Sequence, residues 1–149
     1  MKRLVVRHGR SPFQFALTAV MCAAGLTGLL LPAPGPSSNI ARVFGDYGPL
    51  FYLMMLVSAI VVAAGMVFPR STADRFVTAL HIERIGLWPM SGVALAYATT
   101  NLAVSGVPAL VSALLTSGIG VAALVRVHII NVDLKKICEL LAADASRGE

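Results

Sequence analysis

Four apolar stretches, separated by polar or proline-rich segments, set the pattern of this chain. They cover residues 13–31, 50–68, 87–104 and 108–125, and none of them contains Asp, Glu, Lys, Arg or His. The hydrocarbon core of a bilayer, about 30 Å thick, needs roughly 20 helical residues to cross it. The pattern therefore predicts an all-α integral membrane four-helix bundle that forms a single four-span domain over residues 1–149.

The segments between the stretches indicate how the helices connect. Residues 32–39 contain three prolines, which cannot continue a helix, so we expect an aqueous loop there. Only Ser105-Gly106-Val107 separates the third stretch from the fourth, and Pro108 suits the first turn of a helix. The last two spans should therefore form a tight antiparallel hairpin.

The basic residues predict the orientation. Positive charge stays on the cytoplasmic side of membrane proteins with short loops. Of the 12 Lys and Arg residues, only Arg42 would face outward if both termini were cytoplasmic. We therefore expect a multi-pass protein of a bacterial inner membrane with cytoplasmic N and C termini. The other basic residues lie in three segments that share one side: Lys2, Arg3, Arg7, Arg10; Arg70, Arg75, Arg84; Arg126, Lys135, Lys136, Arg147.

Composition supports the membrane class. Hydrophobic residues make up 57% of the 149 residues and charged residues 13%, against about 25% charged in soluble domains. The net charge of +5 flanks apolar runs, so we expect the lipid bilayer with its anionic inner leaflet as the partner, and no nucleic acid. In an alternative reading, residues 1 to about 33 are a cleaved signal peptide, which would leave the other spans oriented as before.

Two amphipathic segments lie outside the spans. Ser71 with Asp74 resembles a capping box, and the apolar residues after it share one helical face. They predict a short interfacial helix between spans two and three that leads to Trp88. The tail, residues 126–143, should continue the fourth span as an amphipathic helix. Its apolar positions suit either self-association or folding back on the membrane or the bundle: Val127, Ile130, Leu134, Ile137, Leu141.

Small and polar side chains inside the spans indicate helix contacts. Small residues four apart permit close helix approach in lipid, either within the chain or between copies. These pairs and triplets are Ala24/Gly28, Ala59/Ala63, Gly92/Ala96 and Ser112/Thr116/Gly120. The polar groups either bond neighbouring helices or line a narrow path, and a channel would need them to face one another: Thr99, Thr100, Asn101, Thr116.

No pattern predicts catalysis, a cofactor or a metal. His81-Ile82-Glu83 matches half of a zinc deaminase signature, but the Pro-Cys-x-x-Cys partner is missing. Cys22 and Cys138 belong to no paired motif, and no ionisable residue lies inside a span. We therefore expect no enzyme and no catalytic, cofactor-binding or metal-ligating residue.

Two stretches carry a resemblance to a known group. The residues Glu83-Arg84-Ile85-Gly86-Leu87-Trp88-Pro89, continuing to Tyr97, and Gly118-Ile119-Gly120-Val121-Ala122 resemble small four-span membrane proteins of actinobacterial phages, some labelled holin-like. The resemblance implies a self-associating membrane permeabiliser that releases a lytic enzyme for host cell lysis. The best-known holins typically have fewer spans. A non-lytic membrane scaffold, a subunit of a larger membrane complex and a small channel stay as alternatives.

Overall fold

The computed structural model describes residues 12–31, 39–69 and 71–145, and these ranges are all-α with no strand. Short 3-10 turns at Gly45–Tyr47 and Val107–Ala109 precede two of the long helices. The predicted loop at residues 32–39 lies outside the described residues except for Asn39. The helices are α1 (Pro12–Leu30), α2 (Asn39–Phe44), α3 (Gly48–Val67), α4 (Ala73–Ser105) and α5 (Leu110–Ala145).

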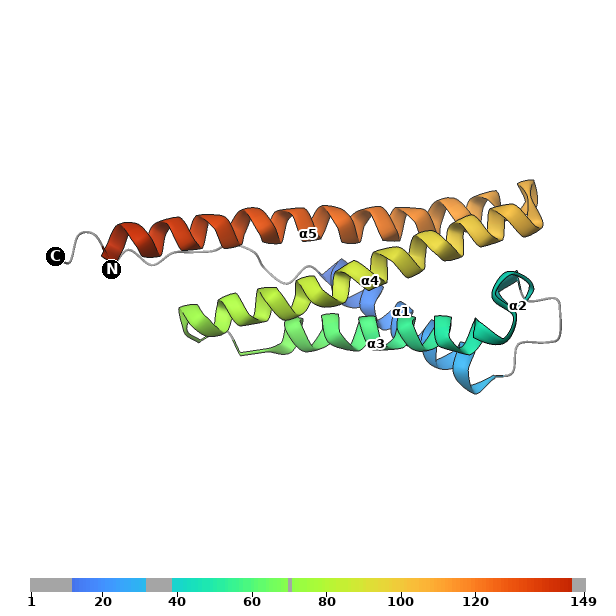
Figure 1. Cartoon of the computed structure of the whole chain (residues 1–149), viewed down its shortest axis with the longest axis horizontal. Helices are drawn as coiled ribbons and strands as arrows, with labels where there is room; N and C mark the ends of the chain where they lie inside the picture. Colours follow the sequence, from blue (N-terminus) through green and yellow to red (C-terminus); the bar gives the residue numbers. More distant parts are fainter. Residues whose placement is uncertain (1–11, 32–38, 70, 146–149) are drawn as a thin grey trace.

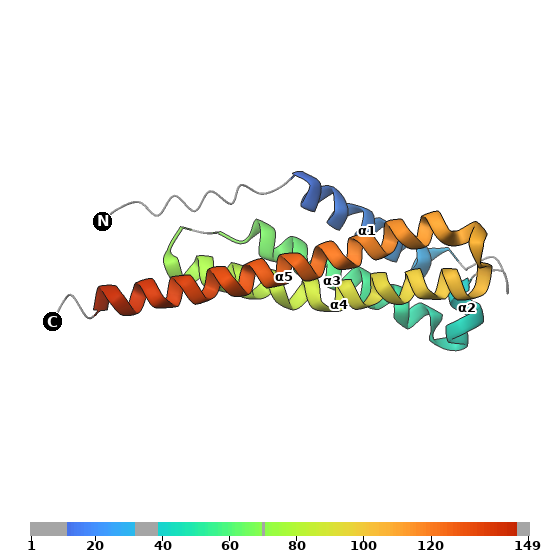
Figure 2. The same ribbon diagram turned by 90° about the horizontal axis from the view of Figure 1, so that it is seen from above.

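Each long helix packs against the next one in the chain. Helix α1 packs against α3, α3 against α4, and α4 against α5, and the short α2 packs on α4. Figure 1 shows α3, α4 and α5 side by side along the long axis, with α2 at the end where the α4–α5 hairpin turns. Figure 2 shows α1 inclined to the other long helices. The core lies along the two faces of α4 that meet α3 and α5.

Three of the predicted features are confirmed. Helices α1 and α3 begin and end within two residues of the predicted stretches 13–31 and 50–68. Helices α4 and α5 form the predicted hairpin, and the turn uses Gly106 at a φ of 60°, a left-handed conformation that glycine adopts without steric cost. The tail continues the fourth apolar stretch without a break, so that α5 runs for 36 residues.

The predicted interfacial helix between the second and third stretches is wrong as a separate element. Residues 73–86 are the first turns of α4, which runs unbroken for 33 residues with Pro89 inside it. The apolar face of this segment packs on the core through Leu80 and the half-buried Phe76 and Val77, which explains why it stays with the bundle. The N-cap is Thr72, whose hydroxyl accepts from the backbone N–H of Arg75, and not Ser71.

Glycines allow the helices to approach closely. A Cβ at Gly65 of α3 would lie 2.6 Å from the backbone nitrogen of Glu83, and one at Gly86 of α4 would lie 2.7 Å from that of Val62. Gly120 likewise lies against Leu95 of α4, so this member of the predicted Ser112/Thr116/Gly120 triplet packs within the chain, whereas Ser112 is exposed. Close backbone contact of this kind is the main source of helix attraction where the solvent is itself apolar.

Two helical segments are long and apolar enough to cross a membrane: Asn39–Val67 and Val107–Leu140. Gln14–Leu30 is a shorter apolar helix. Much of this apolar surface is uncovered, because only 17% of the most apolar part of the Val107–Leu140 segment is buried.

Replacing Gly65 by alanine should lower the melting temperature of the protein in detergent. The new Cβ would meet the α4 backbone, which cannot rotate aside, and overpacking of a core costs about 1–3 kcal/mol. Gly92→Ala is the matched control, since no atom lies within 4 Å of a Cβ there. Circular dichroism melting curves test this, and equal melting of Gly65→Ala and the wild type would contradict the close α3–α4 contact.

Candidate functional site

A charged cluster joins three helices at one end of the bundle. Glu83 of α4 is fully buried, with 0% of its surface exposed. Its Oε1 accepts from Nε of Arg126 on α5 at 2.8 Å and from Nε2 of Gln14 on α1 at 2.7 Å. Glu83 precedes the third apolar stretch, 87–104, which contains no charged residue, but α4 begins before that stretch and carries Glu83 into the core. The apolar stretches therefore did not reveal this buried charge.

Local packing explains how the carboxylate reaches this position. Gly65 lets α3 lie directly against the α4 backbone at Glu83, which removes that part of the helix from solvent. Arg126 is the first residue after the fourth apolar stretch, and the unbroken α5 carries it across the hairpin to α4. A buried carboxylate is costly to desolvate unless it is paired and hydrogen-bonded, and the guanidinium and the amide both serve this purpose.

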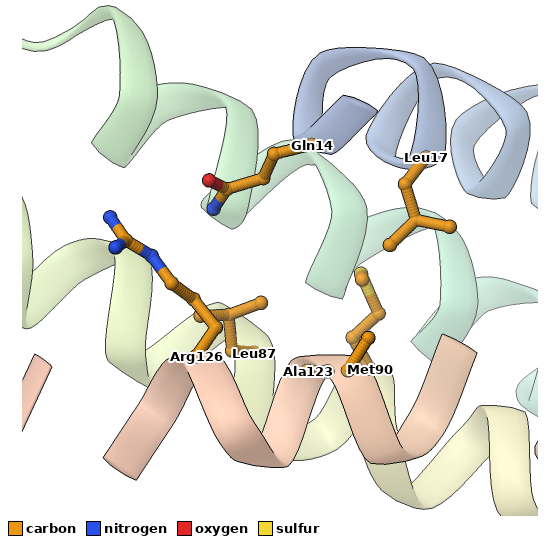
Figure 3. A pocket seen from close by; sticks show the side chains of 7 residues that line it. Gln14, Leu17, Leu87, Met90, Ala123 and Arg126 are labelled. Atoms are coloured by element: carbon orange, nitrogen blue, oxygen red, sulfur yellow. The ribbon is translucent and has the colours of Figure 1, made fainter. Parts of the chain in front are cut away.

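The guanidinium of Arg126 borders a hollow of about 160 Å³ between α1 and α5. Its side chain keeps 21% of its surface exposed, and among the described residues it donates only through Nε. Figure 3 shows Gln14 and Leu17 reaching into this hollow from α1 and Arg126 from α5 on the opposite side, with Leu87 of α4 beside Arg126 and Met90 of α4 facing Leu17. The hollow thus combines one polar end with apolar walls.

A larger open hollow of about 600 Å³ follows along the same two helices. Small residues of α1, among them Ala24 and Gly28, form one wall, and Thr116 and Ile119 of α5 form the other. Helices α3 and α4 provide the floor. The two hollows follow each other between α1 and α5, and we refer to them together as the α1/α5 groove.

A second polar cluster closes the opposite end of the bundle. Nδ2 of Asn39 donates to Oδ1 of the buried Asn101 at 2.9 Å and to the hydroxyl of Ser105 at 2.8 Å. These bonds fasten α2 to the last turns of α4. Since Glu83 and Asn101 are 18 residues apart on one helix, the two clusters are separated by about 27 Å.

The structure does not gather the polar residues that a channel would need. Asn101 bonds with Asn39, whereas the hydroxyls of Thr99 and Thr116 donate to carbonyls of their own helices. Thr99 lies on the exposed side of α4, Thr100 is buried, and Thr116 lines the α1/α5 groove. The arrangement fits helix-to-helix bonding better than a shared polar path.

The remaining sequence candidates take up other roles. The apolar positions of the tail pack on α4, with Val127, Ile130 and Leu134 buried. The tail thus packs on the bundle, which is one of the two interpretations given above. Leu141 belongs to α5, but its surroundings lie outside the described residues. His81 and His128 are exposed. Within the described ranges, no group of three or more His, Cys, Asp or Glu side chains could hold a metal ion.

Comparison with known proteins gives no relative. No family model, no curated protein and no solved structure matches this chain.

Removing only Arg126 should destabilise the protein strongly. Arg126→Leu would leave the Glu83 carboxylate buried without the guanidinium, and breaking one side of a buried pair costs about 3–5 kcal/mol. The double variant Glu83→Gln/Arg126→Leu removes both charges and should regain most of that loss. Arg84→Leu is the control, because Arg84 donates to Asn131 on the exposed side. Thermal melting in detergent measures all three, and equal destabilisation of the single and double variants would refute the coupling.

Proposed function

We propose that this protein is a four-span protein of a bacterial inner membrane. The spacing of its two polar clusters supports the proposal, since about 27 Å along α4 is close to the thickness of a hydrocarbon core. The apolar helix surface between the clusters is largely exposed, as lipid contact requires. The exposed Trp88 lies near the Glu83 cluster and the exposed Tyr47 belongs to the opposite end, which fits the preference of aromatic rings for the two interfaces.

We infer from the basic residues that the charged cluster of Glu83, Arg126 and Gln14 lies on the cytoplasmic side. Arg75 and Arg84 lie on the same end of α4 as Glu83, and Lys135 and Lys136 follow Arg126 on α5. The first turns of α4 and the last turns of α5 then project into the cytoplasm as a short helical pair. Arg84, which donates to Asn131 of α5, helps to hold this pair together.

We propose that the protein works by self-association in the membrane, as a holin-like permeabiliser. The observation that carries this proposal is an uncovered apolar stripe along α5 with a glycine at its centre. Among the described residues, no other helix comes within 4 Å of a Cβ at Gly118, so a second helix could approach it closely. We call these residues the α5 stripe: Val111, Leu114, Leu115, Gly118, Val121 and Val125, of which the five large residues are 53–69% exposed.

A non-lytic scaffold or complex subunit is the second candidate function. The same α5 stripe supports it, because a partner helix could use the surface that a second copy would use. The Glu83–Arg126 pair holds the α4–α5 hairpin in one register, and the bonds of Asn39 fasten α2 to α4, as a stable docking module would need. Permeabilisation separates the two functions, since only a holin-like protein should collapse the membrane potential.

Gly118→Ile should reduce self-association without unfolding the chain. The added side chain would fill the open centre of the α5 stripe and keep a second helix at a distance. Gly92→Ile makes the same change at an equally open position on α4 and serves as the control. Cross-linking of intact membranes through the exposed Lys135 and Lys136 should show large assemblies for the wild type and Gly92→Ile. Unchanged assemblies in Gly118→Ile would exclude the stripe as the contact.

Co-expression of the protein in bacteria with a cytosolic cell-wall hydrolase that lacks an export signal should collapse the membrane potential abruptly and lyse the cells. A potential-sensitive dye and culture turbidity, recorded together, measure both events. Gly92→Ile should act like the wild type, and Gly118→Ile should delay or abolish the collapse. Steady potential and intact cells, with the protein verified in the membrane, would reject permeabilisation and favour the scaffold or subunit.

A further inference from the structure

The α1/α5 groove has the shape and chemistry of a site for an elongated amphiphile. It runs along α1 from Gln14 to Gly28, which is 14 residues or about 21 Å. Its walls and floor are mainly apolar, with Leu17 and Met90 near one end and Met21 and Met55 farther along. Among the described residues that line it, Arg126 is the one that carries a positive charge, and it lies at one end.

Arg126 has N–H donors at that end that are not used by the described residues. A guanidinium carries five N–H donors in a planar fork that matches a phosphate group. Here Nε donates to Glu83, while Nη1 and Nη2 form no hydrogen bond with any described residue. The exposed part of the side chain borders the smaller hollow, so these donors can meet an anion there.

We propose that the α1/α5 groove binds a phospholipid of the inner leaflet that has an anionic headgroup. The inference rests on the proposed membrane location. The phosphate would accept from Nη1 and Nη2 of Arg126, and one acyl chain would lie along the groove between α1 and α5. Basic pockets between membrane helices at the cytoplasmic side are typical sites for anionic headgroups. A second copy of an apolar helix fits less well, because it would leave the Nη donors facing an apolar surface.

Two variants that differ only in Arg126 test the headgroup site. Glu83→Gln keeps the guanidinium, whereas Glu83→Gln/Arg126→Gln removes it without leaving a buried carboxylate. The purified full chain in detergent is titrated with dioleoyl phosphatidylglycerol and, separately, with dioleoyl phosphatidylcholine, and bound lipid is counted by native mass spectrometry. The double variant should bind phosphatidylglycerol roughly tenfold more weakly than Glu83→Gln, since a charge-assisted hydrogen bond is lost.

Lys135→Gln is the matched charge control, because it removes one exposed positive charge from the same helix outside the groove. It should bind phosphatidylglycerol like the wild type. Equal binding by Glu83→Gln and the double variant would overturn the proposal. So would an equal loss in Lys135→Gln, since both results would mean that lipid responds only to overall charge.

Ala24→Phe tests the acyl-chain part. Ala24 is exposed and lines the larger hollow, so a phenyl ring there would fill the groove and leave the core unchanged. Phosphatidylglycerol binding should fall while the melting temperature stays near that of the wild type. A change of oligomeric state with lipid binding intact would overturn the proposal and assign the groove to a second copy. Gly118→Ile changes the α5 stripe and leaves the groove intact, so it should still bind lipid. This variant therefore distinguishes a failure of the self-association proposal from a failure of the lipid proposal.

Discussion

The burial of Glu83 is the constraint on which the arrangement of the helices depends. An ionised carboxylate cannot stay in an apolar interior unless it is paired and hydrogen-bonded. Two of its partners come from the first and last helices, Gln14 on α1 and Arg126 on α5. Glu83 lies 23 residues before Gly106, and Arg126 lies 20 residues after it, so the pair also holds the register of the hairpin far from its turn. A slip of either helix would separate the two charges.

The opposite end of the bundle is held by neutral groups. This difference from the Glu83–Arg126 ion pair is physically reasonable. Asn39 donates hydrogen bonds to Asn101 and Ser105 that need no charge, close to a turn where the chain itself limits movement. Between the two polar ends, close packing holds the helices together, because Gly65 and Gly86 allow the α3 and α4 backbones to approach each other. In a lipid environment, such close packing replaces the hydrophobic effect that would drive a soluble core.

Most of the fold could be predicted from the sequence because the signals are local. Apolar length gives α1 and α3 to within two residues, and the short Gly106 connection gives the hairpin. The site could not be predicted in the same way, because Gln14 and Arg126 lie 69 and 43 residues from Glu83 in the sequence and each looks like an ordinary polar residue near the end of an apolar stretch. One signal was available: Glu83 shares a helical face with Leu80 and Leu87, so a helix that buries these leucines also buries Glu83.

Helix α5 shows how one apolar helix can present separate surfaces. One face, with Ala123, Val127 and Ile130, is buried on α4 and holds the fold together. A second face borders the α1/α5 groove and ends at Arg126, and the α5 stripe around Gly118 forms a third. Because α1 packs mainly on α3, an acyl chain in the groove would brace α1 against α5. The occupant of the groove would then influence the angle at which the α5 stripe meets a neighbouring copy, which gives the membrane lipid a physical route to affect assembly.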